Sequence, residues 1–167
     1  MLGEDSPLLA AKRAGATQTP GGTGALRLSA DFIAQCLPGR GIWLSDPTWP
    51  IHETIFAAAG LKISHYPYVG SDNKLNVAAM LEALEHAPKG DVVLLHACCH
   101  NPTGFDLSQA DWLQVLDVVR RRELLPLIDF AFKTTLPISI AAIICMAIAH
   151  FFWQRYLDKK ENISHEM

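Results

Sequence analysis

Apolar and polar positions along the first 130 residues follow two recurring patterns, one typical of buried strands and one of amphipathic helices. Four runs are nearly continuous in apolar residues, as in strands covered on both faces. These runs are Ile42–Ser45, Lys62–Tyr66, Val92–His96 and Leu125–Phe130. Four further segments have helical spacing of apolar positions. They are Thr23–Cys36, His52–Ala59, Val77–Ala87 and Ser108–Arg122. This alternation predicts an α/β fold with an open, mostly parallel sheet.

Residues at the ends of the predicted helices support these boundaries. Asn76 precedes the third helix and is a residue type that caps helix N-termini. Gly60 follows the second helix, where glycine commonly ends a helix. The three arginines at 120–122 end the fourth helix, where cations suit the negative pole of the helix dipole, and we interpret them as a solvated helix end.

The composition changes near residue 133. Residues 134–154 contain no Asp, Glu, Lys or Arg, and 21 residues would span about 30 Å as a helix, which is roughly the hydrocarbon thickness of a bilayer. Aromatic residues at 151–153 and 156 and cations at 155, 159 and 160 follow. This order predicts a membrane-spanning helix within 133–157 and a cytoplasmic polar tail at 158–167. The alternative is a buried core helix of a larger fold.

The overall composition excludes several classes of protein. Half of the 167 residues are apolar, so a disordered chain is not expected. The net charge is −3, with −4 in residues 1–132 and +1 in residues 133–167, and no basic patch predicts a nucleic-acid partner. Four cysteines are too few and too unevenly spaced for a disulfide framework, and the first residues lack the apolar region of a secretory signal.

Candidate functional residues follow the predicted strands or precede a predicted helix. In a parallel sheet, ligands bind beyond the carboxyl ends of the strands. Gly21, Gly22 and Thr23 lie at the start of a helix, where exposed N–H groups suit a phosphate, although an ordinary glycine turn has the same sequence. Trp49 lies between two prolines after the first strand and is either a stacking platform or a partly buried loop aromatic.

The segment His96–Gly104 contains four potential metal ligands within five residues. Tetrahedral zinc sites combine closely spaced pairs with a distant second pair, and this sequence shows no such second pair, so we expect no metal here. Asn101 begins an Asn-Pro-Thr-Gly turn that presents an amide. Asp129 ends an apolar strand, where a carboxylate needs a cation or donors, and the sequence offers no obvious partner.

These features together match the chemistry of pyridoxal 5′-phosphate. A glycine turn suits its phosphate, Trp49 its ring face and Asn101 its phenolic oxygen. Its pyridinium nitrogen supplies the positive charge that Asp129 needs, and a carboxylate there keeps that nitrogen protonated, so that the ring acts as an electron sink. The sequence therefore predicts a pyridoxal phosphate site.

The strings TPGGTGALR, DPTWPIH, HACCHNPTG and IDFA, in this order, resemble the class I aminotransferases of the aspartate and aromatic amino-acid branch. The resemblance covers about residues 1–131. It implies a partial cofactor-binding large domain at 1–132, of the type I fold of pyridoxal phosphate enzymes. It also implies amino transfer between an amino acid and a 2-oxo acid, a homodimer and a cytoplasmic location. If the apolar run 134–154 inserts into a bilayer, we expect the protein to be membrane-associated instead.

The resemblance assigns roles to six residues. Gly21, Gly22 and Thr23 match the phosphate-binding turn. Trp49 and Asn101 match residues that contact both the cofactor and the substrate, and Asp129 matches the partner of the pyridinium nitrogen.

Three departures from the family pattern limit the predicted activity. No counterpart of the family's Schiff-base lysine follows Asp129, because Lys133 is too close to it in sequence, so no catalytic residue is assigned. The arginine that pairs with the substrate carboxylate is also missing. Phe132 replaces the tyrosine that donates to the phenolic oxygen. We therefore expect an enzyme fragment that is inactive alone, with an unrelated transporter-like tail. The alternatives are a membrane-anchored, non-catalytic α/β module and a non-functional fusion or pseudogene product.

Overall fold

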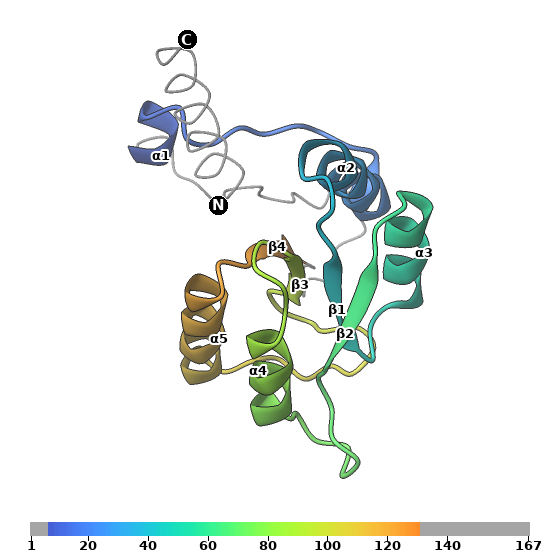
Figure 1. The fold of residues 1–167 in the computed structure, drawn as a ribbon, viewed down its shortest axis with the longest axis vertical. Helices are drawn as coiled ribbons and strands as arrows, with labels where there is room; N and C mark the ends of the chain where they lie inside the picture. The colour runs from blue at the N-terminus through green and yellow to red at the C-terminus, as the bar shows by residue number, and fades with distance from the viewer. Residues whose placement is uncertain (1–6, 131–167) are drawn as a thin grey trace, which may run out of the picture. The chain divides into compact units, whose positions relative to one another are not determined.

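The computed structural model describes residues 7–130 of the chain. Helix α1 (Pro7–Ala10) belongs to a different compact unit from the residues that follow Thr17. Within residues 18–130, helices and strands alternate from α2 to β4, as Figure 1 shows. The elements are α2 (Gly21–Cys36), β1 (Ile42–Asp46), α3 (Pro50–Ala58), β2 (Ile63–Pro67), α4 (Val77–Glu85), β3 (Val92–His96), α5 (Gln109–Arg121) and β4 (Leu125–Asp129).

The four strands form one sheet in the order β2-β1-β3-β4, and all of their pairings are parallel. The predicted α/β class and parallel sheet are therefore confirmed. In register, Ile42 lies beside Ile63 and Val92, and His96 lies beside Asp129. This last pairing brings two polar residues to the carboxyl ends of neighbouring strands.

Each face of the sheet is covered by two helices. Alternate residues of β3 point to opposite faces, because side chains alternate along a strand. Val93 and Leu95 pack in a cluster with α4 and α5, whereas Val92 and Leu94 pack in a cluster with α2 and α3. Burial on both faces explains why the strands are continuous apolar runs.

The helix boundaries lie within two residues of the predicted ones, and local chemistry explains the differences. Helix α3 begins two residues early because Pro50 occupies its first turn, where a missing N–H is tolerated. Helix α4 ends at Glu85, before Pro88 disfavours the helical conformation at Ala87. The predicted cap is confirmed, since the Asn76 side chain accepts a hydrogen bond from the Ala79 N–H.

A buried carboxylate joins the amino-terminal ends of β1 and β3. Asp91 is 8% exposed and accepts from the Gly41 N–H at 2.9 Å and from Trp43 Nε1 at 3.1 Å. Asp91 Oδ2 also lies 3.1 Å from the position that a Cβ at residue 41 would take, so a side chain at this position would crowd the carboxylate. This clamp lies at the end of the sheet opposite to the candidate functional residues.

No helix within residues 7–130 is both long enough and apolar enough to cross a bilayer. The predicted membrane span at 134–154 and the tail at 158–167 lie outside the described residues.

We predict that Asp91→Ala destabilises the fold by about 2–5 kcal/mol, because it leaves one buried donor and one half-buried donor without their charged acceptor. Urea unfolding followed by circular dichroism measures the change. The matched control is Asp117→Ala, which removes an exposed carboxylate that pairs with Arg121 on the same helix, and it should change stability by less than about 0.5 kcal/mol. Equal effects of the two substitutions would contradict the role of the Asp91 clamp.

Candidate functional site

The connections between strands lead outward in opposite directions from β1 and from β3, the two neighbouring central strands. From β1 the chain crosses through α3 to β2 on one side, and from β3 it crosses through α5 to β4 on the other. Helices α3 and α5 cover opposite faces of the sheet. The segments that follow β1 and β3 therefore diverge, and ligands of open α/β sheets bind at such a point. Residues 46–52 and 96–104 form these two segments.

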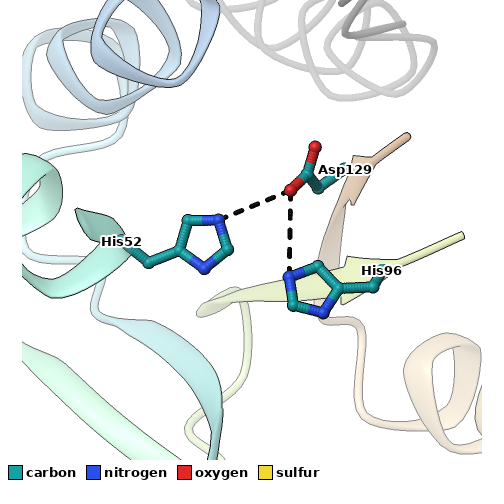
Figure 2. Close-up of side chains that lie close together, drawn as sticks. All are labelled: His52, His96 and Asp129. Atoms are coloured by element: carbon teal, nitrogen blue, oxygen red, sulfur yellow. Dashed lines mark ion pairs between the residues drawn. The ribbon is translucent and has the colours of Figure 1, made fainter. Parts of the chain in front are cut away.

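Three side chains meet at this edge of the sheet, as Figure 2 shows: His52, His96 and Asp129. Asp129 is the last residue of β4, His96 is the last residue of β3, and His52 lies in the first turn of α3. Asp129 Oδ2 is 3.4 Å from His52 Nε2 and 3.8 Å from His96 Nε2. Both distances exceed the ordinary hydrogen-bond length of about 2.7–3.2 Å. One carboxylate oxygen therefore faces two imidazole nitrogens without a tight bond to either.

Burial and the two imidazoles set the charge of this cluster. Burial by itself raises the pKa of Asp129, but the interactions with His52 and His96 outweigh it and bring that pKa below its ordinary value. Burial, with a further contribution from nearby His52, lowers the pKa of His96 to about 4. At neutral pH the carboxylate is thus ionised beside a neutral His96, and the Asp129 side chain keeps 22% of its surface exposed. Asp129 therefore presents a negative charge at this edge of the sheet.

The turn that begins α3 positions His52 and Trp49. Trp49 is the N-cap residue of α3, and its backbone oxygen accepts from the His52 N–H at 2.9 Å. The two rings meet edge to face, with centroids 5.4 Å apart. Thr48 Oγ1 lies 2.8 Å from His52 Nδ1, so a hydroxyl fixes the far side of the imidazole. Trp49 is thereby linked through His52 to Asp129.

His100 connects the loop after β3 to the end of β1. Its Nε2 lies 2.9 Å from Ser45 Oγ, and its Nδ1 lies 2.8 Å from Thr103 Oγ1. The ring is buried and stacks on Tyr68 with centroids 3.8 Å apart. Burial, with nearby His96 as the next contribution, lowers the pKa of His100 to about 3. The His100 imidazole is therefore neutral, lies within hydrogen-bond distance of a hydroxyl at each nitrogen, and anchors the backbone directly before Asn101.

The six predicted cofactor residues divide into two groups. Trp49, Asn101 and Asp129 lie at or directly beyond the carboxyl ends of β1, β3 and β4. Asn101 is exposed and follows His100, whose ring contacts that of His96 at 4.3 Å between centroids. Gly21, Gly22 and Thr23 form the first turn of α2, and no side chain caps this turn. Gly21 has a φ of +76°, which favours glycine.

Sequence reasoning missed the partners of Asp129. It found no cation or donor for this carboxylate, and the structure corrects that statement by placing His52 and His96 beside it. His52 is 77 residues away in the chain, and no local spacing indicates the contact.

The chain matches the family model for class I and II aminotransferases over residues 1–156. It is 80% identical over 132 residues to an aromatic-amino-acid aminotransferase of Pseudomonas aeruginosa, a match that covers 79% of this chain and 33% of that protein. It is also 45% identical over 134 residues to an aspartate aminotransferase of Salmonella typhi, covering 80% and 34%. The chain thus spans about a third of the length of these relatives.

Solved structures show the same fold. An aromatic-amino-acid aminotransferase from Burkholderia pseudomallei, covalently bound to pyridoxal phosphate, superposes with a TM-score of 0.75 at 47% identity over 79% of this chain and 33% of that one. A Psychrobacter enzyme for aromatic amino acids, cocrystallised with aspartic acid, has a TM-score of 0.76 at 34% identity over 95% and 38%.

The family match changes the interpretation of the C-terminal residues. We expected the resemblance to end at about residue 131 and an unrelated, transporter-like tail to follow. The family model instead continues to residue 156 and so includes the apolar run 134–154. The comparisons therefore give no support to an unrelated tail.

We predict that the chain loses stability as the pH falls from 7 toward 4. The unfolded chain protonates His100 near its ordinary pKa of 6.5, whereas the folded chain does so only near pH 3, so acid favours unfolding within this window. Urea unfolding at several pH values measures the slope. His100→Gln should make the slope shallower without abolishing it, because His96 titrates in the same range. An unchanged slope in His100→Gln would contradict the assignment.

Proposed function

Because the chain belongs to the class I and II aminotransferase family, we propose that it is part of an aspartate or aromatic amino-acid aminotransferase and forms a portion of its cofactor-binding domain. The reaction moves an amino group between an amino acid and a 2-oxo acid with the help of pyridoxal 5′-phosphate. The observation that carries the proposal is the ionised, half-buried carboxylate of Asp129 at the carboxyl end of β4. The 80% identity to an aromatic-amino-acid aminotransferase favours aromatic substrates.

The chemistry of the residues suits the cofactor. Asp129 offers a negative charge to the ring nitrogen and keeps that nitrogen protonated, and the bound ring then acts as an electron sink during amino transfer. The interactions with His52 and His96 keep the pKa of this carboxyl below its ordinary value. A charged hydrogen bond in such a partly buried place is stronger than one in water. Asp129 is therefore the residue that we assign to the ring nitrogen.

The start of helix α2 suits the phosphate group of the cofactor. Gly22 and Thr23 supply backbone N–H groups in the first turn of a 16-residue helix, and the N-cap residue Pro20 makes no side-chain cap hydrogen bond there. The Gly21 N–H donates to the Thr19 carbonyl oxygen at 2.9 Å, and Gly21 contributes the positive φ with which the turn begins. The positive end of the helix dipole favours an anion at this turn. We assign these three residues to the phosphate group of the cofactor.

Trp49 and Asn101 complete the proposed set. The Trp49 indole is half-buried and held against His52, so it offers a fixed flat surface to the cofactor ring. The Asn101 amide is exposed next to the anchored His100 and is available to the phenolic oxygen and to the substrate. Both residues lie on the segments that diverge at the strand-order switch. Roles for them in substrate binding, and a homodimer in the cytoplasm, are proposals that rest on the family.

The membrane-anchored alternative depends on the charge-free run at 134–154. The family match includes this run, so we favour the enzyme over an anchored, non-catalytic module or an unrelated fusion product. Carbonate extraction of membranes separates these cases, because an anchored module stays in the membrane pellet.

We predict that Asp129→Asn weakens the binding of pyridoxine 5′-phosphate about 10- to 100-fold. This analogue has no aldehyde, so it cannot react with surface lysines, and its affinity reports only on ring and phosphate recognition. The expected factor corresponds to one charge-assisted hydrogen bond of about 1.5–3 kcal/mol. Quenching of tryptophan fluorescence or equilibrium dialysis measures the dissociation constant.

The matched control is Asp72→Asn, which removes an exposed carboxylate in the turn before α4 and should leave binding unchanged. Circular dichroism establishes that both variants fold as the parent chain does. Equal affinity of the parent chain and Asp129→Asn would contradict the proposed cofactor site.

A further inference from the structure

Two cysteine side chains lie next to each other in the segment that follows β3. Cys98 and Cys99 are both partly exposed, and the S–H of Cys99 donates to Cys98 Sγ at 3.8 Å. Adjacent side chains of an extended chain point in opposite directions, so neighbours in sequence do not ordinarily bring their ends together. The pairing of the two sulfur atoms therefore depends on the shape of this loop.

Hydrogen bonds on both sides of the pair hold the backbone in this shape. The chain bends around Cys99, whose φ of +55° is a left-handed conformation that is uncommon for residues other than glycine. Before the pair, the Ala97 N–H donates to the Asp129 carbonyl oxygen at 2.8 Å. After the pair, the His100 N–H donates to an Asp106 carboxylate oxygen at 3.1 Å. The two thiols are thus held side by side before any ligand binds.

The separation of the sulfur atoms suits a bridging atom better than a disulfide. A disulfide brings two sulfur atoms to about 2.05 Å and ordinarily joins Cα atoms about 4.4–6.8 Å apart. Adjacent residues have Cα atoms only about 3.8 Å apart across a trans peptide. A larger atom that is bonded to both sulfurs leaves them further apart, so it requires less change in the backbone.

We propose that Cys98 and Cys99 form a chelating site for trivalent arsenic, such as the arsenic of an aryl arsenoxide. Two As–S bonds form as two S–H bonds break, and the arsenoxide oxygen leaves as water. Arsenic stays trivalent, so the step needs no oxidant or reductant. This inference does not rest on the proposed function, because it uses only the two thiols and the backbone that holds them.

The number of ligands favours arsenic over zinc at this pair. Thiolates are soft ligands that bind both, but a structural zinc site needs four protein ligands. The two ring nitrogens of the neighbouring His100 already lie beside the hydroxyls of Ser45 and Thr103. Trivalent arsenic that carries one carbon substituent needs only two further bonds, and the two sulfurs supply them.

Intact-mass spectrometry of the reduced 167-residue chain tests the site with phenylarsine oxide as the probe. Glutathione in excess is the competitor, because a monothiol displaces arsenic from a single cysteine but not from two thiols that are held together. We expect one adduct that survives glutathione and is released by dithiothreitol, a small dithiol. Absence of a glutathione-resistant adduct would overturn the proposal.

Cysteine variants locate the adduct. Cys98→Ser and Cys99→Ser should each weaken binding by about 100-fold or more, because linking two binding groups raises affinity about 10²–10⁴-fold. The matched control is the double variant Cys36→Ser/Cys145→Ser, which removes the other two cysteines of the chain and should bind as the parent chain does. Circular dichroism establishes that each variant folds as the parent chain does. Glutathione-resistant binding in a single variant, or its loss in the control, would contradict the assignment.

Urea unfolding separates the folded site from adjacency in sequence alone. A ligand that binds the folded chain more tightly than the unfolded chain stabilises the fold. Phenylarsine oxide should therefore raise the urea midpoint of the parent chain and of Cys36→Ser/Cys145→Ser, and it should leave that of Cys98→Ser unchanged. An unchanged or lower midpoint in the double variant would show that the bend around Cys99 does not prepare the site, and the proposal would be wrong.

Discussion

The parallel sheet is buried on both faces, and this constraint determines where polar chemistry can occur. Helices α2 and α3 cover one face and α4 and α5 cover the other, so most side chains within the central strands β1 and β3 are buried. A functional group can reach a ligand only where a strand ends. The reversal of strand order between β1 and β3 then separates the two segments that leave the carboxyl edge. All the residues that we place around Asp129 lie on these segments, in the first turn of α3 or at a strand terminus.

The elements of the fold could be predicted because each depends on local sequence. The run Val92–His96 is predicted with the bounds that the structure has, since a strand buried on both faces must be continuously apolar. Asn76 marks the start of α4 through a hydrogen bond to a residue three positions away. The register that sets His96 beside Asp129 could not be predicted, because it arises from pairing between strands separated by a whole helix.

The candidate site was predictable only in part, for the same reason. Trp49, Asn101 and Asp129 could be located because each follows an apolar strand. The contact between His52 and Asp129 joins residues far apart in the chain and depends on how α3 packs against the sheet. His100 was considered as a metal ligand within a cluster of histidines and cysteines, but its two ring nitrogens lie beside the hydroxyls of Ser45 and Thr103. Its buried ring therefore supports the loop that carries Asn101.

The proposed cofactor would be held at two points that come from different parts of the fold. Asp129, at the carboxyl end of β4, would meet the ring nitrogen, and the first turn of α2 at Gly21–Thr23 would meet the phosphate. The carboxylate lies beside His52 and His96, and their interactions with it bring its pKa below its ordinary value, so a negative charge is present before a ligand arrives. A site whose charge is fixed in advance by its neighbours does not have to reorganise when a cationic ring nitrogen binds.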